Sequence, residues 1–459
     1  MTRYEWASRI PQNIFSKLTR SHRSQSAVAE KTGTDEAAQY AARVEEERRF
    51  YDNCLQVADL PAIYSYWSNK YVRPKLEAFG FSHPNELYPQ QFAKQCRRDS
   101  QAQNRFVSIG SGNCDVEVDL AAALKANGLS NFTLECVDLS NAMLDRGRAA
   151  ADSQGVSSLM SFTEGDFNAW KPAHRYDGVM VNQALHHVTE LEALFSAIKA
   201  SLNPGGLFIT SDMIGRNGHM RWPEALDIVQ EFWAELSPRY HYNHQLKREE
   251  PQYINWDCSI AGFEGIRAQD ILPLLLKNFH FHLFIAFANI IDIFIDRGFG
   301  HNFDPDSESD RSFVDRVHHR DELEIAAGRV KPTHMIAVLS NEPGECLHHP
   351  PLSPSFCLRT AVALPKAVIL APGTMVSADP NPVPASSRVT RLSWTTNVRE
   401  VELHIDAPNG PLFAREAGIS SALTGPWVVN DMTFYLQDGT ATKPTDQSAT
   451  LAKLVVSVD

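Results

Sequence analysis

Carboxylate and amide side chains stand directly after short apolar runs in the middle of the chain. Asp138 ends one such run, Asp166 and Phe167 follow the next, and Asn182 ends a third. A carboxylate in the place of Asp138 can accept hydrogen bonds from both hydroxyls of a ribose. Asp166 can accept from an adenine amino group, and Phe167 offers a ring face to a purine. These residue types predict a site for an adenosine-containing ligand.

A glycine turn precedes these residues. The apolar run 106–109 ends on Gly110 and Gly112, and a helical pattern follows over 116–127. Such a strand-turn-helix unit lets a ligand approach the backbone of an α/β sheet. A pyrophosphate site would need the pattern Gly-x-Gly-x-x-Gly, but its last glycine is replaced by Asp115, whose charge repels phosphate. The turn therefore favours a nucleoside ligand without phosphate over a dinucleotide.

The elements that position these residues alternate between strand and helix, as a parallel sheet with crossovers requires. The predicted strands are 106–109, 133–137, 160–163, 178–181 and 206–210, with later strands at 280–287 and 333–339. The predicted helices are 116–127, 140–153 and 190–202.

At this point the chain resembles the class I S-adenosylmethionine-dependent methyltransferases. The motifs that carry the resemblance are Val107–Gly112, Asp138-Leu139-Ser140, Gly165-Asp166-Phe167, Ala184-Leu185-His186-His187 and Leu202-Asn203-Pro204-Gly205-Gly206. The resemblance implies a Rossmann-like doubly wound sheet that binds S-adenosyl-L-methionine. The cofactor-binding residues that it implies are Gly110, Gly112, Asp138, Leu139, Asp166, Phe167 and Asn182. The chain departs from the family pattern at Cys114, where a third glycine is common, and at Ser108, where an acid is common.

Four side chains are candidates for the catalytic base: Asp212, His186, His187 and His219. Methyl transfer from a sulfonium is an in-line displacement, so the enzyme mainly positions the acceptor and excludes water. An oxygen acceptor also needs a base, whereas an amine mainly needs its neutral form. His186 and His187 have an alternative role, in which they cap a helix or pack beside the cofactor. Asp212 is favoured for contact with the substrate.

These residues predict methyl transfer to a small molecule or a glycan, with O-methylation placed ahead of N-methylation. The alternative is a catalytically idle scaffold that binds S-adenosylmethionine and recruits a partner. Asp212, His219, Arg216 and Arg221 are polar groups on the acceptor side and favour the enzyme.

The chain divides by composition into several segments. They are residues 1–35, expected to be poorly ordered; 36–104, a helical cover; 105–340, the methyltransferase domain with a helical insertion at 215–278; 341–366, a linker; and 367–459, a β-sandwich. The aromatic run 60–71 is predicted to be either core or a lid, and the charged run 45–49 to form a solvated face. The last segment is similar to bacterial immunoglobulin-like modules and could contact a partner or a glycan.

Charge and cysteine usage exclude other classes. The formal net charge of −12 removes the usual electrostatic signature of a nucleic-acid-binding protein. The seven cysteines are scattered and never spaced Cys-x-x-Cys, and His241 with His244 has no cysteine nearby, so no metal site is predicted. No apolar run is long enough to span a membrane, and no secretory signal is evident, so a cytoplasmic location is expected.

Overall fold

The computed structural model describes residues 40, 42–45, 47–49, 52, 60–260, 262–359, 368–369, 371, 373–379, 381–383 and 387–458. The chain forms two compact units, residues 1–358 and residues 359–459, called here the first and second units. The segment 1–35, predicted to be poorly ordered, lies outside the described residues. Part of the predicted linker 341–366 is structured, since it contains a short strand and a helix of the first unit.

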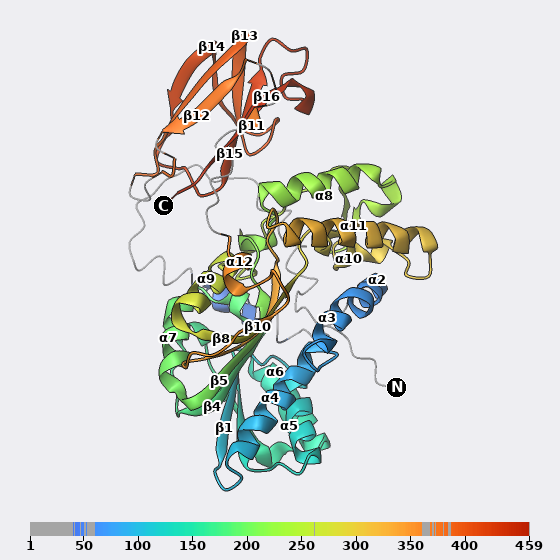
Figure 1. The fold of residues 1–459 in the computed structure, drawn as a ribbon, viewed down its shortest axis with the longest axis vertical. Coiled ribbons are helices and arrows are strands. Elements are labelled where there is room, and N and C mark those ends of the chain that lie inside the picture. Colours follow the sequence, from blue (N-terminus) through green and yellow to red (C-terminus); the bar gives the residue numbers. More distant parts are fainter. Residues whose placement is uncertain are drawn as a thin grey trace. The chain divides into compact units, whose positions relative to one another are not determined.

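The first unit is built on a mixed eight-stranded sheet (Figure 1). Its strands, in spatial order, are β10 (Leu347–His348), β8 (His280–Phe287), β9 (His334–Ser340), β5 (Leu202–Met213), β4 (Tyr176–Asn182), β1 (Asn104–Ile109), β2 (Phe132–Asp138) and β3 (Met160–Glu164). All seven strands predicted for this unit are present. The order reverses between β1 and β4, so their carboxyl ends open a crevice at that point, where α/β sheets bind ligands. Only β9 runs antiparallel to its long neighbours β5 and β8.

Helices cover both faces of this sheet (Figure 1). On one side lie α4 (Pro84–Arg98), α5 (Asp115–Ala126) and α6 (Asn141–Ser153), and on the other lie α7 (Leu191–Ser201) and α9 (Ala268–Asn278). The helix α4 packs closely, because the ring of Phe92 stacks on Phe106 of β1 at a centroid distance of 4.3 Å. A Cβ at Gly178 of β4 would lie 2.4 Å from that ring, so this strand position requires glycine.

A second helical layer stands beyond the carboxyl ends of the strands. It contains α2 (Ala62–Trp67), α3 (Arg73–Glu77), α8 (Pro223–Glu235), α10 (Asp292–Ile295) and α11 (Glu308–Ala326), with α8 and α11 side by side (Figure 1). The predicted insertion 215–278 is not purely helical, because it also contains a small hairpin of β6 (Tyr242–Asn243) and β7 (Arg248–Glu249). Of these helices, α2 and α10 contribute side chains to the larger cavity described below.

The aromatic run 60–71 serves as core in one place and as a pocket wall in another. Trp67 is buried, and its indole N–H donates to Nδ1 of His318 on α11 over 3.2 Å. Tyr66 and Tyr71 both donate to Asp315 of the same helix. Tyr64 instead lines a cavity described below.

The second unit is an antiparallel sheet around its own apolar core. Its strands are β11 (Val368–Ile369), β12 (Met375–Asp379), β13 (Arg391–Ile405), β14 (Leu412–Leu423), β15 (Met432–Asp438) and β16 (Thr450–Val456). The long strand β13 pairs with β12 in its first half and with β15 in its second half, with an irregularity between Thr395 and Glu400. One strand thus connects two parts of the sheet, which share the core residues Trp394, Leu403 and Phe434.

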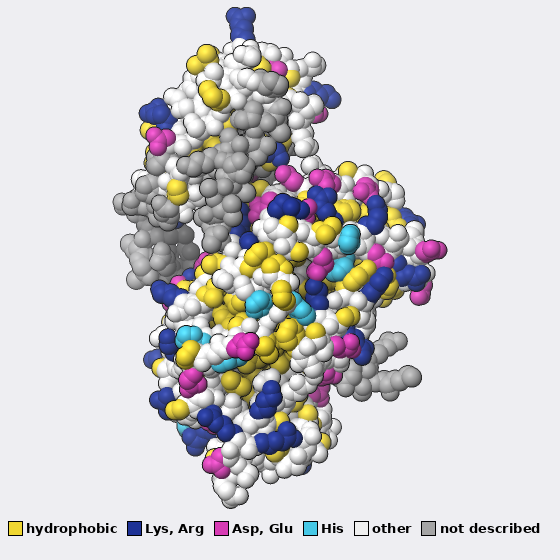
Figure 2. Space-filling model, in the orientation of Figure 1, with side chains coloured by type: hydrophobic (Ala, Val, Ile, Leu, Met, Phe, Trp, Pro, Cys, Tyr) yellow, Lys and Arg dark blue, Asp and Glu magenta, His cyan; other side chains and the backbone are white. Residues whose placement is uncertain are grey.

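Basic and acidic side chains are interspersed over the face of the first unit seen in Figure 2, with hydrophobic and histidine side chains among them. On that face the described residues form no continuous basic surface, in keeping with the acidic net charge. Among the described helices, none combines the length and apolar character needed to cross a bilayer.

The buried His318 gives a pH-dependent stability that can be measured. Burial lowers the pKa of His318 to about 4, so below pH 6.5 the unfolded chain takes up a proton that the folded chain does not. Between pH 7.5 and pH 5.5 the free energy of unfolding should therefore fall by about 1.4 kcal/mol through this residue. Urea titrations at the two pH values measure this fall. In the His318→Asn variant, the decrease in the free energy of unfolding from pH 7.5 to pH 5.5 should be about 1.4 kcal/mol smaller than in the wild type.

The exposed neighbour His319 provides the control, since His319→Asn should leave the pH dependence unchanged. An unaltered pH dependence in His318→Asn would contradict the assignment of a neutral, buried imidazole at this position.

Candidate functional site

The glycine turn lies at the carboxyl end of β1. Gly110 and Gly112 have φ angles of +73° and +56°, which side-chain-bearing residues rarely adopt. A Cβ on Gly110 would lie 2.6 Å from Cβ of Ala184, so the turn can approach the β4 loop only because it carries no side chain. The turn thus brings its backbone to the crevice between β1 and β4.

Asp138, at the end of β2, holds this turn in place. Its Oδ2 accepts a hydrogen bond from the amide of Gly112 over 2.7 Å, and its Oδ1 accepts from the amide of Ser140 over 2.9 Å. The carboxylate therefore fixes both the glycine turn and the residue that precedes α6. Ser140 itself caps the N-terminus of α6 by accepting from the amide of Met143.

A cavity of about 440 Å³ adjoins the glycine turn and is called here the first cavity. Its lining residues are Glu47, Gly110, Gly112, Asp138, Leu139, Met143, Phe167, Gln183, Ala184 and His187. Two of these side chains are carboxylates and none is Lys or Arg. The cavity therefore suits a ligand with an apolar, hydroxyl-bearing body and positive charge, and it disfavours phosphate.

Two predicted cofactor residues border this cavity without lining it. Asp166 accepts from the hydroxyl of Tyr40 over 2.8 Å and from the amide of Asn168, so it fixes the turn that carries Phe167. Asn182 is buried, and its Oδ1 accepts from the hydroxyl of Tyr88 on α4. Both residues position the cavity wall in this structure.

The described residues between 40 and 52 are helical and lie over the first cavity. Glu47 lines it, Arg48 pairs with Glu164 at 3.1 Å, and Asp52 accepts from the hydroxyl of Ser140. The prediction that the charged run 45–49 forms a solvated face is therefore wrong for Glu47, whose side chain is only 12% exposed. The cover of the cavity comes from this segment.

Three histidines and one glutamate converge beside the first cavity. This histidine–glutamate cluster consists of His186, His187, His219 and Glu264. Oε1 of Glu264 lies 2.6 Å from Nε2 of His219 and 3.4 Å from Nε2 of His186, and its Oε2 lies 3.6 Å from Nε2 of His187. The sequence predicts the three histidines as site residues but separates them from Glu264 by more than 40 positions.

Asp212, at the end of β5, holds the cluster from behind. Its Oδ2 accepts from the amides of Ala184 and Leu185, and its Oδ1 lies 2.6 Å from Nδ1 of His186. The side chain is fully buried. Asp212 was favoured for contact with the substrate, but its oxygens are engaged by the protein itself, so it acts here as a positioning residue.

The buried charges shift the ionisation of the cluster in opposite directions. Burial alone would lower the pKa of His186, but the carboxylates of Asp212 and Glu264 raise it to about 10. Burial also lowers the pKa of His219, although Glu264 opposes this. Although burial works against it, the histidines hold the pKa of Glu264 well below its usual range. The cluster thus combines a cationic imidazole, a neutral imidazole and a carboxylate.

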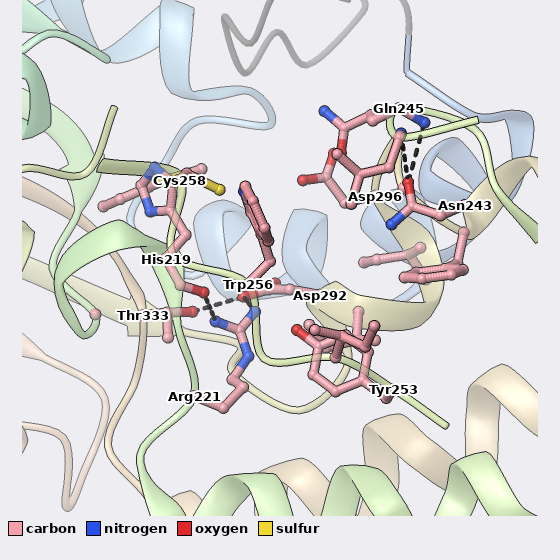
Figure 3. Close-up of a pocket in the computed structure, with 18 of the residues that line it drawn as sticks. His219, Arg221, Asn243, Gln245, Tyr253, Trp256, Cys258, Asp292, Asp296 and Thr333 are labelled. Carbon is pink, nitrogen blue, oxygen red and sulfur yellow. Dashed lines mark hydrogen bonds and ion pairs between the residues drawn. The ribbon is translucent and has the colours of Figure 1, made fainter. Parts of the chain in front are cut away.

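A larger cavity of about 1020 Å³, the second cavity, begins at His219 (Figure 3). Its walls are largely apolar and include Tyr64, Tyr253, Ile254, Trp256, Ile293, Ile295 and Phe299. Asp292 stands at one side, where it accepts from Arg221 and Thr333. Because His187 lines the first cavity and His219 lines the second, the histidine–glutamate cluster lies between the two.

Two residues of this site have no clear signal in the sequence. Glu264 is one of 55 acidic residues and stands in a stretch without regular periodicity. Glu47 sits in a charged run that is typical of a solvated helix. The only local hint for Glu264 in the sequence is the glycine that follows it. In the structure Gly265 has a φ of +64°, and its carbonyl oxygen accepts a hydrogen bond from the amide of Gly218. This bond joins the two loops of the insertion.

Comparison with known proteins identifies the family of the domain at the centre of the first unit. Residues 106–206, from β1 to the start of β5, match the family model described as a methyltransferase domain. The chain thus contains a methyltransferase domain.

Two curated relatives of the methyltransferase domain are fungal. The sterol 24-C-methyltransferase ERG6B of Gibberella zeae is 23% identical over 254 residues, which cover 50% of this chain and 64% of the relative. The sterol 24-C-methyltransferase erg6 of Aspergillus fumigatus is 35% identical over 66 residues, which cover 14% of this chain and 18% of the relative. The chain thus spans less than two thirds of the length of either relative.

One similar solved structure is the O-methyltransferase from a trans-AT PKS multienzyme of Brevibacillus brevis, in complex with S-adenosyl-L-homocysteine. It is 13% identical, with 59% of this chain and 75% of that chain covered and a TM-score of 0.33. At that score it carries no weight for function.

Both departures of the methyltransferase domain from its family pattern have a structural reason. Ser108 donates from Oγ to Oε1 of the buried Glu117 on α5 over 2.6 Å, so an acid reaches this position from the helix. Cys114 adopts a φ of +60°, the conformation that a glycine would take most easily. Its sulfur packs against Gly147 of α6. A Cβ on Gly147 would lie only 2.8 Å from this sulfur, so the contact requires glycine there.

The close approach of Gly110 can be tested with a matched pair of variants. Gly110→Ala and Gly128→Ala both place alanine at a φ above +70°, which costs about 1–2 kcal/mol. Only Gly110→Ala adds a contact at 2.6 Å, because nothing lies within 4 Å of the position of a Cβ on Gly128. In chemical denaturation, Gly110→Ala should lower the free energy of unfolding by about 1–3 kcal/mol more than Gly128→Ala does. Equal losses would mean that the turn and the β4 loop are not in contact.

Proposed function

We propose that this protein is an S-adenosyl-L-methionine-dependent methyltransferase that acts on a small molecule, with oxygen as the methyl acceptor. The observation that carries the proposal is the first cavity: it opens at the glycine turn of a methyltransferase domain, and among its described lining residues are two carboxylates and no Lys or Arg. This charge suits a sulfonium cation and an adenosine, whereas a dinucleotide would bring its pyrophosphate against Glu47 and Asp138.

The residues present fit this cofactor. Asp138 would accept the ribose hydroxyls, Leu139 and Phe167 would pack against the adenine, and the glycine turn would lie against the methionine end. The bound cofactor supplies an electrophilic methyl group. The chain itself must hold the acceptor in line with that group and accept the proton that an attacking hydroxyl loses.

The histidine–glutamate cluster is proposed to accept that proton. It separates the first cavity from the second, so an acceptor in the second cavity would present its hydroxyl to His219. Oxygen is favoured over nitrogen because the cluster provides a neutral imidazole beside a buried carboxylate, an arrangement that accepts a proton. An amine in its neutral form would not require this group.

The second cavity indicates the character of the acceptor. Its walls are mainly aromatic and aliphatic, and its lining residues include three with a buried donor that has no hydrogen-bond partner among the described residues: Nε of Arg221, Nε1 of Trp256 and Nε2 of Gln245. Unpaired buried donors are costly unless a ligand satisfies them. The acceptor is therefore proposed to be a largely apolar molecule that carries carbonyl, ether or hydroxyl oxygens.

The described residues that line both cavities belong to the first unit, so methyl transfer is assigned to that unit. The second unit is proposed to be an immunoglobulin-like module that contacts a partner or a glycan. In support, β14 pairs only with β13 among the described strands, and Ile419 and Leu423 on it are 73% and 57% exposed.

Isothermal titration with S-adenosylmethionine tests the cofactor. The wild type should bind it, and Asp138→Asn should bind roughly 10- to 100-fold more weakly, because a charge-assisted hydrogen bond contributes about 1.5–3 kcal/mol. Asp152→Asn, which changes an exposed acid on the neighbouring helix α6, should bind like the wild type. NAD⁺ should give no heat.

No binding to the wild type, or equal affinity in Asp138→Asn, would refute the cofactor assignment. If the wild type binds S-adenosylmethionine, transfer of labelled methyl groups to a panel of apolar alcohols, phenols and amines would separate oxygen from nitrogen acceptors.

Binding of S-adenosylmethionine without transfer to any compound of the panel would favour the idle scaffold.

A further inference from the structure

The histidine–glutamate cluster has the composition of a metal centre as well as of a base. Nε2 of His186, Nε2 of His219 and a carboxylate oxygen of Glu264 lie within 4.8 Å of one another, each offering one ligand atom. Two imidazoles and one carboxylate form a ligand set that binds divalent first-row transition metals in proteins. We propose that these three side chains bind one such cation, with Nε2 of His187 adjacent to the site.

The spacing is compatible with such an ion after a small adjustment. A tetrahedral ion with bonds of about 2.0–2.1 Å separates its ligand atoms by about 3.3 Å. The distance from Nε2 of His186 to Oε1 of Glu264 is 3.4 Å, and that from Nε2 of His187 to Oε2 is 3.6 Å. The pair of His219 and Glu264, at 2.6 Å, must open, since in this structure the two share a hydrogen bond.

The outer nitrogens of the two neighbouring histidines lie near carboxylates, as is common in metal centres. A metal-binding histidine commonly donates its other ring N–H to a carboxylate, which orients the ring and makes it more basic. Nδ1 of His186 lies 2.6 Å from Asp212, and Nδ1 of His187 lies 3.3 Å from Glu47. Their Nε2 atoms are thereby directed to the same carboxylate, Glu264.

Burial and charge supply a further reason. Glu264 is 3% exposed, and its Oε2 has no hydrogen-bond partner among the described residues. Asp212 is equally buried, so two negative charges stand next to the imidazoles, and among the described residues neither carboxylate forms an ion pair with Lys or Arg. One divalent cation balances both charges at once.

Ligand chemistry also selects the type of ion. Two nitrogen ligands and one oxygen favour Zn²⁺, Fe²⁺, Co²⁺ or Ni²⁺, whereas Mg²⁺ and Ca²⁺ need mostly oxygen ligands. The ion would have an open position on the side of His219, which lines the second cavity. Its effect on the reaction depends on the proposed function: a hydroxyl bound there would lose its proton more easily. The binding itself does not depend on that function.

Metal titration of the full-length protein tests the site. After dialysis against a chelator, calorimetry should show one equivalent of Zn²⁺ bound and no competition by Mg²⁺. Glu264→Gln keeps the shape of the side chain but removes the charge, and should weaken Zn²⁺ binding by more than about 100-fold. Asp212→Asn should weaken it by about 10- to 100-fold, because it removes the carboxylate behind His186.

His244→Gln is the matched control, because this exposed histidine lies outside the cluster and pairs with Asn302. It should bind Zn²⁺ like the wild type. Circular dichroism shows whether each variant is folded, and His219→Gln replaces Glu264→Gln should the latter fail to fold. The Co²⁺-loaded wild type should show the visible absorption bands of protein-bound Co²⁺. The Glu264→Gln variant should lack these bands.

The proposal is overturned by a wild type that binds no divalent ion, or by a folded Glu264→Gln or His219→Gln variant that binds Zn²⁺ as tightly as the wild type. Titration of the same samples with S-adenosylmethionine keeps the two proposals apart. Zn²⁺ binding without S-adenosylmethionine binding would reject only the proposed function. The reverse result would reject only the metal site and leave the cluster as a proton acceptor.

Discussion

The buried carboxylate of Asp212 is the interaction on which the site depends. It joins the end of β5 to the turn after β4, because its two oxygens accept from the amides of Ala184 and Leu185 and face Nδ1 of His186. These contacts fix the turn that forms one wall of the first cavity, and they direct His186 toward Glu264. A single charged group therefore positions both a wall of the first cavity and the histidine–glutamate cluster.

A second carboxylate, at the end of β2, performs the same task on the other side of the crevice. Asp138 binds the amides of Gly112 and Ser140, so the glycine turn and the start of α6 are held by one side chain. Parallel strands end at the same edge of a sheet, which is why side chains after β1, β2, β4 and β5 meet there. The insertion after β5 then closes the crevice from above and contributes His219 and Glu264.

The arrangement separates two chemical environments by one layer of side chains. The first cavity is small and acidic, and the second is larger and mainly apolar. Between them, the histidine–glutamate cluster carries buried charge, which requires either protons on the imidazoles or a cation. The proposed methyl transfer would use this separation, because the acceptor must attack the methyl group from the side opposite the sulfonium with water excluded.

The sequence by itself determined the order of strands and helices, the glycine turn and the acidic residues after β2 and β3. These features are local: apolar runs of four to seven residues report burial, and glycines or acids at their ends report turns. The prediction of β8 at 280–287 agrees with the structure at both ends, because this strand is apolar over nearly its whole length. The class of ligand followed from the same local information, through Asp115 in place of a glycine.

Only the tertiary structure decided which side chains meet. Glu264 approaches His186 across 78 positions of sequence, and Glu47 reaches His187 across 140. The sequence favours Asp212 for contact with the substrate, but in the folded chain its carboxylate is buried and accepts from the turn after β4, because β4 pairs with β5. Periodicity reports which side of an element is buried, but not what it faces. The meeting of buried charges is set by long-range packing, so it appears only in the folded chain.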